Sequence, residues 1–300
     1  MSRRSIARRE RGFTLVEAIV VIVLLGVLGT IVAVFIRAPI QGYADSVARA
    51  ELSDQADLAL RRIARDVRLA LPNSIRTANN GGALEFLLTK AGGRYLSADD
   101  AIDGAPALDF DGGAAAFTVV SATTRFDAVG KDDYVVVYNL GAGMQPSDAW
   151  AFGQPNSNIA RIDHTGSVSV PAIDSKNDLP VIYLTTNPFA TQSPPMPSPT
   201  QRFQVVSGPV SYYCAPGPDG SLALWRAWGY DIKAAQSVPP VGGQRALVAT
   251  RLANCNAMFQ YGTTETQRSG LVLLALELKA RNQGDPSIRL VHQVHVDNTP

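Results

Sequence analysis

Glu17 is the residue of this chain whose surroundings most require a chemical explanation. It stands at the start of an apolar stretch, and residues 18–36 carry no charge. An ionised carboxylate in hydrocarbon costs about 2.5 to 3.5 kcal/mol on insertion scales, so it needs a cationic partner. No basic residue lies between Thr14 and Ile36. The partner must therefore come from outside this segment, and the expected chemistry is charge pairing.

The residues before Glu17 predict where the chain is sent. Five arginines occur within residues 1–12, against a single acid, Glu10. A cationic head followed by an apolar run is a membrane-targeting design. Arginines ahead of the run predict a single-pass inner-membrane protein with a cytoplasmic N-terminus and a periplasmic C-terminal domain. The alternative is a plain signal anchor in which Glu17 occurs by chance.

The two cysteines, Cys214 and Cys255, are the other candidates for a chemical bond. In an oxidising periplasm, two cysteines in one domain most simply form a disulfide. Closing a loop of about 40 residues stabilises a fold by roughly 3 to 4 kcal/mol in the chain-entropy model. Two free buried thiols are the alternative. A zinc site is not expected, because too few other ligands lie nearby.

No residue pattern predicts catalysis, so we expect no enzyme, catalytic residue, metal or cofactor. His292 and His295 are three apart in an expected strand, which places them on opposite faces and prevents a simple shared metal site. His164 stands alone in a loop-like stretch. Residues 109–112 resemble a fragment of a calcium loop but lack its remaining ligands, so a turn is expected. Nucleophile and phosphate-loop motifs are absent from the sequence.

The charge balance argues against nucleic acid as a partner. The chain has 27 basic and 26 acidic residues among 300. Residues 1–12 hold five of the basic residues and one of the acidic residues. Residues 13–300 therefore have 22 basic and 25 acidic residues, a formal charge of −3. That balance gives no basic excess for binding nucleic acid. The 288 remaining residues suffice for a membrane helix and one sizeable globular domain, or two small ones.

A long helix must position Glu17. The 19 uncharged residues 18–36 form about 28 Å of helix, enough to span a bilayer. Residues 43–71 then repeat apolar side chains at spacings of three or four, which predicts an amphipathic helix. Pro72 disfavours helical angles at Leu71 before it. We therefore expect one helix, roughly 13–71, whose first half lies in the membrane and whose second half packs on a globular domain.

Beyond Pro72 the sequence predicts strands separated by Gly-rich turns, and so an α+β fold with a β-rich domain at 73–300. The Pro-rich residues 190–200 are expected to form a surface loop or linker, with the option that they divide two sheets or sub-domains. The candidate strands are 84–88, 117–121, 134–139, 167–170, 181–184, 210–214, 222–230, 246–250, 257–261, 271–279 and 288–296.

The run Arg11-Gly12-Phe13-Thr14-Leu15-Val16-Glu17 resembles the class III signal of type IV prepilins and type II secretion pseudopilins. The resemblance implies that a prepilin peptidase cuts after Gly12 and that the new N-terminal residue, Phe13, is N-methylated. It implies that Glu17 neutralises the N-terminal amine of a neighbouring subunit. The fold that it implies is a helical spine on a β-rich domain.

The resemblance also implies a place where the helix loosens during assembly. A glycine occupies that place in the family, and here it is Gly26. The family's proline further along would fall at Val34, where it is absent, and Pro39 follows five residues later. The loosened segment is therefore expected to be shifted or missing. Implied partners are major and minor pilins, the inner-membrane assembly platform and membrane lipid.

Further segments are similar to minor prepilins of the mannose-sensitive haemagglutinin (MSHA) pilus, of the MshO type, which are relatives of PilW-type minor pilins and J-type pseudopilins. Large members of this family form a tip or priming complex. The resemblance implies a minor prepilin in initiation or tip assembly of an adhesive, MSHA-like pilus. A J-type pseudopilin is the alternative, and a membrane-anchored periplasmic enzyme or binding protein a more distant one. The similar segments are 35–37, 41–43, 59–76, 270–272 and 292–300.

These inferences divide the chain into four parts. The expected parts are a cytoplasmic leader (1–12), a transmembrane and assembly helix (13–36), its amphipathic continuation (37–72) and a periplasmic β-rich domain (73–300).

Overall fold

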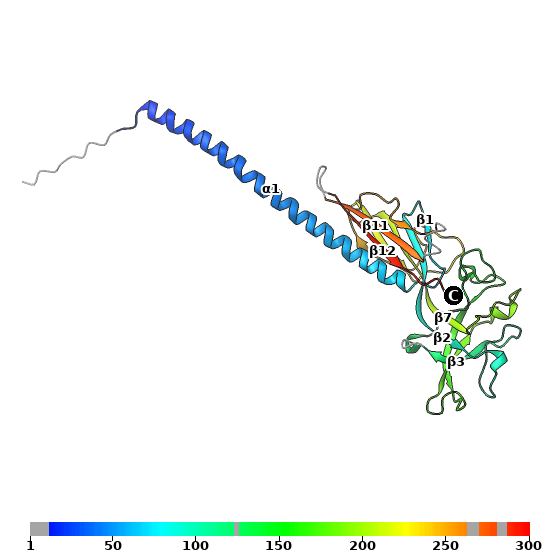
Figure 1. The fold of residues 1–300 in the computed structure, drawn as a ribbon. Helices are drawn as coiled ribbons and strands as arrows, with labels where there is room; N and C mark the ends of the chain where they lie inside the picture. The colour runs from blue at the N-terminus through cyan, green and yellow to red at the C-terminus, as the bar shows by residue number, and fades with distance from the viewer. Residues whose placement is uncertain (1–11, 123–125, 263–269, 281–286) are drawn as a thin grey trace, which may run out of the picture. The chain divides into compact units, whose positions relative to one another are not determined.

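A computed structural model describes residues 12–122, 126–262, 270–280 and 287–300 (Figure 1). The chain forms two compact units, residues 1–51 and 52–300. The single long helix α1 (Leu15–Arg68) contributes to both. The β-strands all belong to the second unit.

In the first unit, α1 is exposed on every side. Every side chain described between Phe13 and Val47 is exposed. A helix that is apolar all round is suited to a lipid environment rather than to one face of a water-soluble domain. By length and composition, α1 is able to cross a membrane. The helix is therefore consistent with membrane anchoring.

The helix continues through Pro39. Proline in a helix interior removes one backbone hydrogen bond, yet α1 keeps its helical assignment there. At Gly26, the backbone carbonyl accepts a second hydrogen bond, from the Thr30 hydroxyl over 2.8 Å. The structure thus places Gly26 and Pro39 in regular helix, and their part in flexibility stays a prediction.

In the second unit, one face of α1 packs on the β-rich domain. Leu52, Ala56, Leu60, Ile63 and Val67 are buried at spacings of three or four residues and join the core of the sheets. Full burial of one large aliphatic side chain is worth about 1.5 to 3 kcal/mol. The predicted α+β class, a helix packed on a β-rich domain, is confirmed.

The helix ends at Arg68, three residues before the predicted end at Leu71. Strand β2 (Ala83–Tyr95) is the reason. The Leu71 N–H donates to the carbonyl of Leu87, and the Thr89 N–H donates to that of Leu69, both over 2.8 Å. Because β2 takes these backbone groups, they are not available to extend the helix.

The strands form a nine-stranded sheet, in the order β1-β2-β3-β6-β5-β4-β7-β8-β9, and a three-stranded sheet, β10-β11-β12. All the pairings between named strands are antiparallel. The remaining strands are β1 (Arg76–Ala78), β3 (Ala116–Ala122), β4 (Tyr134–Val136), β5 (Ile159–Val168), β6 (Leu179–Leu184), β7 (Arg202–Pro216), β8 (Leu222–Trp228), β9 (Gln244–Ala249), β10 (Phe259–Gln260), β11 (Leu271–Lys279) and β12 (Ser287–His295).

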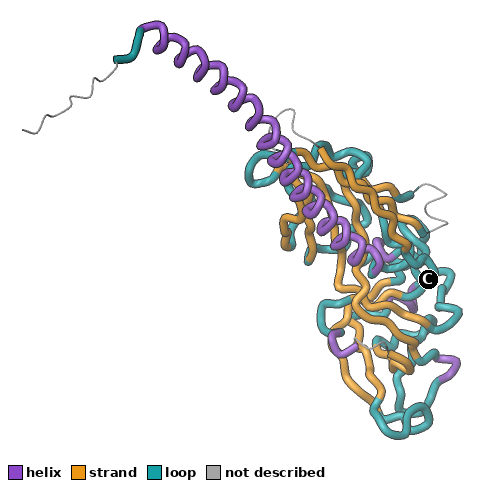
Figure 2. Tube along the Cα trace, turned by 60° about the vertical axis from the view of Figure 1, so that its left-hand side comes forward, coloured by secondary structure: helices purple, strands orange, loops and turns teal. Residues whose placement is uncertain are grey.

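Figure 2 colours the strands of the domain orange, and two of them, β2 and β7, are longer than the other described strands, with 13 and 15 residues. They pair with each other from Ala83↔Tyr213 to Arg94↔Arg202. One end of this pair joins β1, β8 and β9 beside α1, and we call that part the helix half. The other end closes a ring with β3, β6, β5 and β4, which we call the barrel half. The register of β2 shifts around Thr89, where the helix half meets the barrel half, as expected for bulges that bend a strand.

Each half has its own hydrophobic core. The barrel half is filled with aromatic side chains, and the rings of Phe117 and Phe203 meet edge to face at 5.2 Å. Edge-to-face contact is a favoured geometry for aromatic pairs. Between the two halves lies a smaller cluster around the fully buried Trp150. The domain is therefore packed continuously from α1 to the barrel.

The Pro-rich residues 190–200 do not divide two sheets. They connect β6 to β7, which both belong to the nine-stranded sheet. The prolines lie at the surface, while Gln192 and Ser198 are buried anchors. The Gln192 Nε2 donates to the Ser157 carbonyl over 3.1 Å, and the Ser198 N–H donates to the Tyr95 hydroxyl over 3.2 Å. The segment is a surface loop that Gln192 and Ser198 anchor to the domain.

His164 lies in strand β5, so its expected loop position was wrong. Its imidazole stacks on the ring of Tyr183 at 4.2 Å between centroids. The strand begins at Ile159, well before the predicted start at Ser167. In its first half, the exposed Arg161 and Asp163 interrupt a short set of buried apolar residues, which leaves a weak hydrophobicity pattern.

Cys214 on β7 and Cys255, in the loop between β9 and β10, form a disulfide. The predicted pairing is therefore present, and the alternative of two free thiols is not. The bond ties the nine-stranded sheet to the segment that leads into the three-stranded sheet.

Candidate functional site

The N-terminal motif is built on the first turn of α1. Gly12, Phe13 and Thr14 precede the helix. Thr14 caps it: its Oγ1 accepts the N–H of Glu17 over 3.3 Å, and its carbonyl accepts the N–H of Ala18 over 3.1 Å. A threonine in this place satisfies donors that the helix itself leaves unpaired. The Gly12–Phe13 bond therefore lies just outside regular structure, with the Phe13 side chain 75% exposed.

Glu17 occupies the first turn of the helix, with an exposed side chain. A carboxylate there is favoured by the positive end of the helix dipole. Among the described residues, no cation lies within ion-pair distance of Glu17. The described structure thus leaves its carboxylate open to a partner, and the pairing itself stays a prediction.

A second polar site joins α1 to the sheet in the helix half. The Oδ2 of Asp66 accepts from the Tyr212 hydroxyl over 2.8 Å and from the Arg226 Nε over 2.7 Å. Burial raises the pKa of Tyr212, and the neighbouring charge of Asp66 adds to that rise. Asp66 is a charged residue outside the apolar repeat of residues 43–71, which predicts an exposed position, but it is buried.

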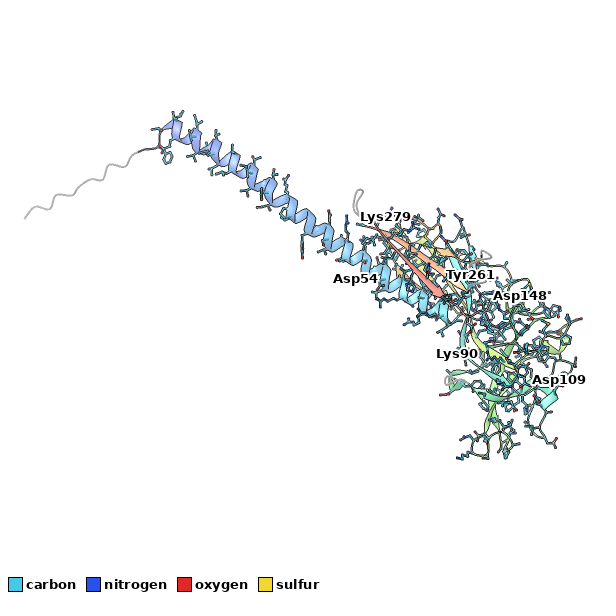
Figure 3. The ribbon with its side chains drawn as sticks, in the orientation of Figure 1. Asp54, Lys90, Asp109, Asp148, Tyr261 and Lys279 are labelled. Atoms are coloured by element: carbon cyan, nitrogen blue, oxygen red, sulfur yellow. A yellow bond between two sulfur atoms is a disulfide. The ribbon has the colours of Figure 1, made fainter. Side chains whose placement is uncertain are left out.

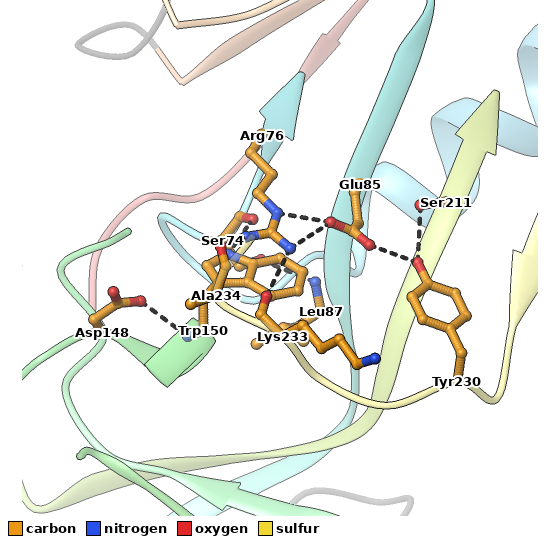
Figure 4. A network of polar contacts seen from close by, with 10 residues as sticks. All are labelled: Ser74, Arg76, Glu85, Leu87, Asp148, Trp150, Ser211, Tyr230, Lys233 and Ala234. Atoms are coloured by element: carbon orange, nitrogen blue, oxygen red, sulfur yellow. Dashed lines mark hydrogen bonds and ion pairs between the residues drawn. The ribbon is translucent and has the colours of Figure 1, made fainter. Parts of the chain in front are cut away.

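Figure 4 shows a third polar network, where the two halves of the domain meet. Glu85 of β2 binds the guanidinium of Arg76 at 2.6 Å and the Tyr230 hydroxyl at 2.8 Å. Arg76 lies over the ring of Trp150, 3.6 Å from its centroid. The indole N–H of Trp150 donates to the Ser74 carbonyl over 3.1 Å. Each buried polar group in this chain of contacts has a partner, which is typical of a structural network.

The described residues do not bring together a metal-binding cluster of three or more His, Cys, Asp or Glu side chains. Asp109 forms the turn expected from the sequence, its Oδ1 accepting the N–H of Asp111 over 2.8 Å. His292 is partly buried and His295 exposed in β12, so their side chains lie on opposite faces as predicted.

The site residues inferred from sequence fall into both units. Gly12, Phe13, Glu17, Gly26 and Pro39 lie in the first unit, at the start of α1 and along it. The structure places them on one element and leaves their roles in processing and assembly to experiment. The disulfide belongs to the second unit.

Comparison with known proteins identifies a family motif at the start of the chain. The family model for the prokaryotic N-terminal methylation motif matches residues 7–33, which include Gly12, Phe13, Glu17 and Gly26. Neither the curated proteins nor the solved structures gave a match. The motif family is structural rather than catalytic. With the apolar helix and the β-rich domain, the match supports a type IV pilin-like prepilin, of the kind that a prepilin peptidase processes and that assembles with other pilins.

Proposed function

We propose that this chain is a minor prepilin that takes part in initiation or tip assembly of a type IV, MSHA-like pilus. Cleavage follows Gly12, Phe13 becomes the methylated N-terminus, and Glu17 docks the subunit. The observation that carries the proposal is the exposed carboxylate of Glu17 in an apolar helix within the matched motif.

Electrostatics explains why cleavage and docking belong together. Cutting after Gly12 leaves a cationic amine on Phe13, directly before the cap residue Thr14. That amine stands at the positive end of its own helix dipole, which is unfavourable. In a low-dielectric environment, an unpaired charge costs several kcal/mol. The Glu17 carboxylate of a neighbouring subunit neutralises the amine, and the pairing removes the cost for both groups.

The large second unit supports a tip role over a shaft role. It has its own helix-packing core and a separate barrel half, so each subunit carries a substantial folded body outside the membrane. In the proposed topology, the N-terminus is cytoplasmic and this body is periplasmic until assembly moves the subunit into the pilus. Adhesion by the assembled pilus is part of the same proposal.

The direct test is the N-terminus of the mature chain. Protein from cells that contain the prepilin peptidase should begin with N-methylated Phe13 in intact-mass and N-terminal peptide spectra. Protein from a peptidase-deleted strain should keep Met1 and serves as the control. An intact Met1 in both strains, or a cut within or after the apolar run, would rule the proposal out. Normal pili with lost protein secretion in a deletion strain would assign the chain to a secretion system.

A further inference from the structure

The second unit contains an open groove of about 1100 Å³ that is lined by cationic side chains. Its walls come from the last turns of α1, the outer face of β2 and β7, and the end of β3. Among the described lining residues there is no acid. The cations are Arg65, Arg68, Lys90, Arg94 and Arg202.

Most of this positive charge is not neutralised by described residues of the chain. Lys90 pairs with Asp133 at 2.8 Å. Arg94 donates to two neutral acceptors, the Thr200 carbonyl at 3.2 Å and the Gln201 Oε1 at 3.0 Å. Arg65 and Arg202 are exposed and make no ion pair within the described residues. The groove therefore presents a net positive surface.

The positions of two of these arginines are unfavourable for the fold itself. Arg94 and Arg202 stand directly opposite each other in the β2–β7 pair. Like charges at such positions destabilise a sheet. Arg65 and Arg68 have a structural explanation, since cations favour the C-terminal turn of a helix. Arg94 and Arg202 in the β2–β7 pair have no comparable structural explanation. Binding of an anionic ligand would explain why two arginines stand opposite each other there.

The chemistry of the groove favours carboxylates of a polypeptide. Guanidinium groups bind carboxylates through paired, charge-assisted hydrogen bonds. Single-stranded nucleic acid would need exposed aromatic rings for its bases. The one aromatic residue among the described lining is Phe203, which is 1% exposed and belongs to the barrel core. The observations therefore favour an acidic peptide over nucleic acid.

The chain itself carries a peptide of the required charge. Residues 98–111, which we call the acidic segment, contain five aspartates and no basic residue. Asp99, Asp103 and Asp111 are exposed. Within one chain, Asp100 lies near the groove, because the Gln201 Nε2 donates to its Oδ2 over 2.6 Å and Gln201 directly precedes the lining residue Arg202. The rest of the acidic segment lies away from the groove, and Figure 3 shows Asp109 well apart from Lys90.

We propose that the cationic groove of one copy binds the acidic segment of a second copy. Two different patches meet in this contact, so it places two copies side by side without a two-fold axis between them. The inference deepens the proposed function and rests on it. It adds a charge-based contact between folded domains to the Glu17 contact between helices.

Site-specific photo-crosslinking in the membrane of living cells tests the contact. The full chain carries p-benzoylphenylalanine in place of Leu69, an exposed lining residue. We expect a dimer whose cross-linked peptide is the acidic segment of a second, differently tagged copy. High salt should reduce its yield. Absence of a dimer, or a cross-link to another part of the chain or another protein, would overturn the proposal.

Charge reversal gives the decisive control. Arg94→Glu with Arg202→Glu should lower the dimer yield at least about tenfold, as expected for the loss of about 1.4 kcal/mol or more. Adding Asp103→Arg and Asp111→Arg should restore it. Lys131→Glu with Lys176→Glu makes the same charge change at exposed sites outside the groove and should leave the yield unchanged. Unchanged thermal unfolding of each variant excludes misfolding.

Two readouts separate the possible failures. If every variant begins with methylated Phe13 but forms no salt-sensitive dimer, the groove contact is wrong and the proposed function stands. If Met1 is intact throughout, the proposed function itself fails. Salt-sensitive binding of a single-stranded oligonucleotide that Arg94→Glu with Arg202→Glu abolishes, without the dimer, would assign the groove to nucleic acid and overturn the proposal.

Discussion

Arg226 of β8 donates its Nε proton to Oδ2 of Asp66 on α1 over 2.7 Å, and the two side chains are only 13% and 12% exposed. Tyr212 donates to the same oxygen. This cluster binds the helix to the sheet within a largely apolar contact, and the Gln55 Nε2 adds a hydrogen bond to the Thr250 hydroxyl over 3.2 Å.

Replacing Asp66 with Ala should destabilise the second unit by about 3 to 5 kcal/mol, because it leaves a buried guanidinium without its counter-charge. Urea unfolding of the detergent-solubilised chain, followed by tryptophan fluorescence, measures the change. Asp57→Ala on the same helix is the matched control, since Asp57 pairs with the largely exposed Arg61. That loss should stay within about 0.5 kcal/mol. Equal losses in both variants would contradict the assigned role of Asp66.

Glu17→Ala should leave membrane insertion intact or improve it, because a charge that costs about 2.5 to 3.5 kcal/mol in the membrane is removed. Pilus assembly should fail, since the neighbour's amine is left unpaired. Complementation of a deletion strain, scored by surface pili and by co-purification of other pilins, measures the effect. Glu51→Ala, an exposed change on the same helix, should complement fully. Normal piliation with Glu17→Ala would refute the amine–carboxylate mechanism.

Protein purified from the native membrane should show no free thiol after unfolding without reduction, since Cys214 and Cys255 are paired. Cys214→Ser with Cys255→Ser should lower the free energy of unfolding by roughly 3 to 4 kcal/mol, the value for a loop of about 40 residues. Thiol labelling with mass spectrometry tests for free thiols, and urea unfolding measures the loss of stability. Two labelled thiols per wild-type chain would disprove the disulfide.

Tyr95 predicts a loss of stability at alkaline pH. Burial raises its pKa to about 12, against an opposing contribution from the Ser198 N–H. Below pH 10, the phenol is protonated in folded and unfolded chains alike, so its contribution is fully present. Between pH 10 and 12, the unfolded chain ionises first, and stability falls until the folded group also ionises.

The measurement is the unfolding temperature from pH 8 to 12 in wild type and Tyr95→Phe. The variant also loses the acceptor for Ser198, so it should be less stable than wild type below pH 10. Its decline above pH 10 should nevertheless be shallower than that of wild type. Parallel declines in the two proteins would show that Tyr95 does not titrate as described.

Local patterns predicted the elements well where one face is apolar and the other polar. Strand β11 runs over Leu271–Lys279 as predicted, because Leu276, Glu277 and Leu278 alternate. The apolar stripe of α1 predicted its buried face from Leu52 to Val67. The N-terminal motif needed no tertiary information, since its residues are neighbours in sequence.

Features that depend on distant partners were not predictable. The burial of Asp66 depends on Arg226, which local spacing does not place near it. The opposition of Arg94 and Arg202 depends on the register of two long strands. A two-residue period specifies which face of a strand is buried but not which strand lies beside it. The groove therefore had no signal in the sequence.

The sharing of β2 and β7 by both halves has a consequence for how the second unit unfolds. The same two backbones contribute to the helix half and to the barrel half, so breaking the β2–β7 pairing removes support from both cores. Proteins open in contiguous cooperative units, and we expect the paired segments of β2 and β7 to belong to one such unit. Loss of the β2–β7 pairing is thus expected to expose the helix half and the barrel half together.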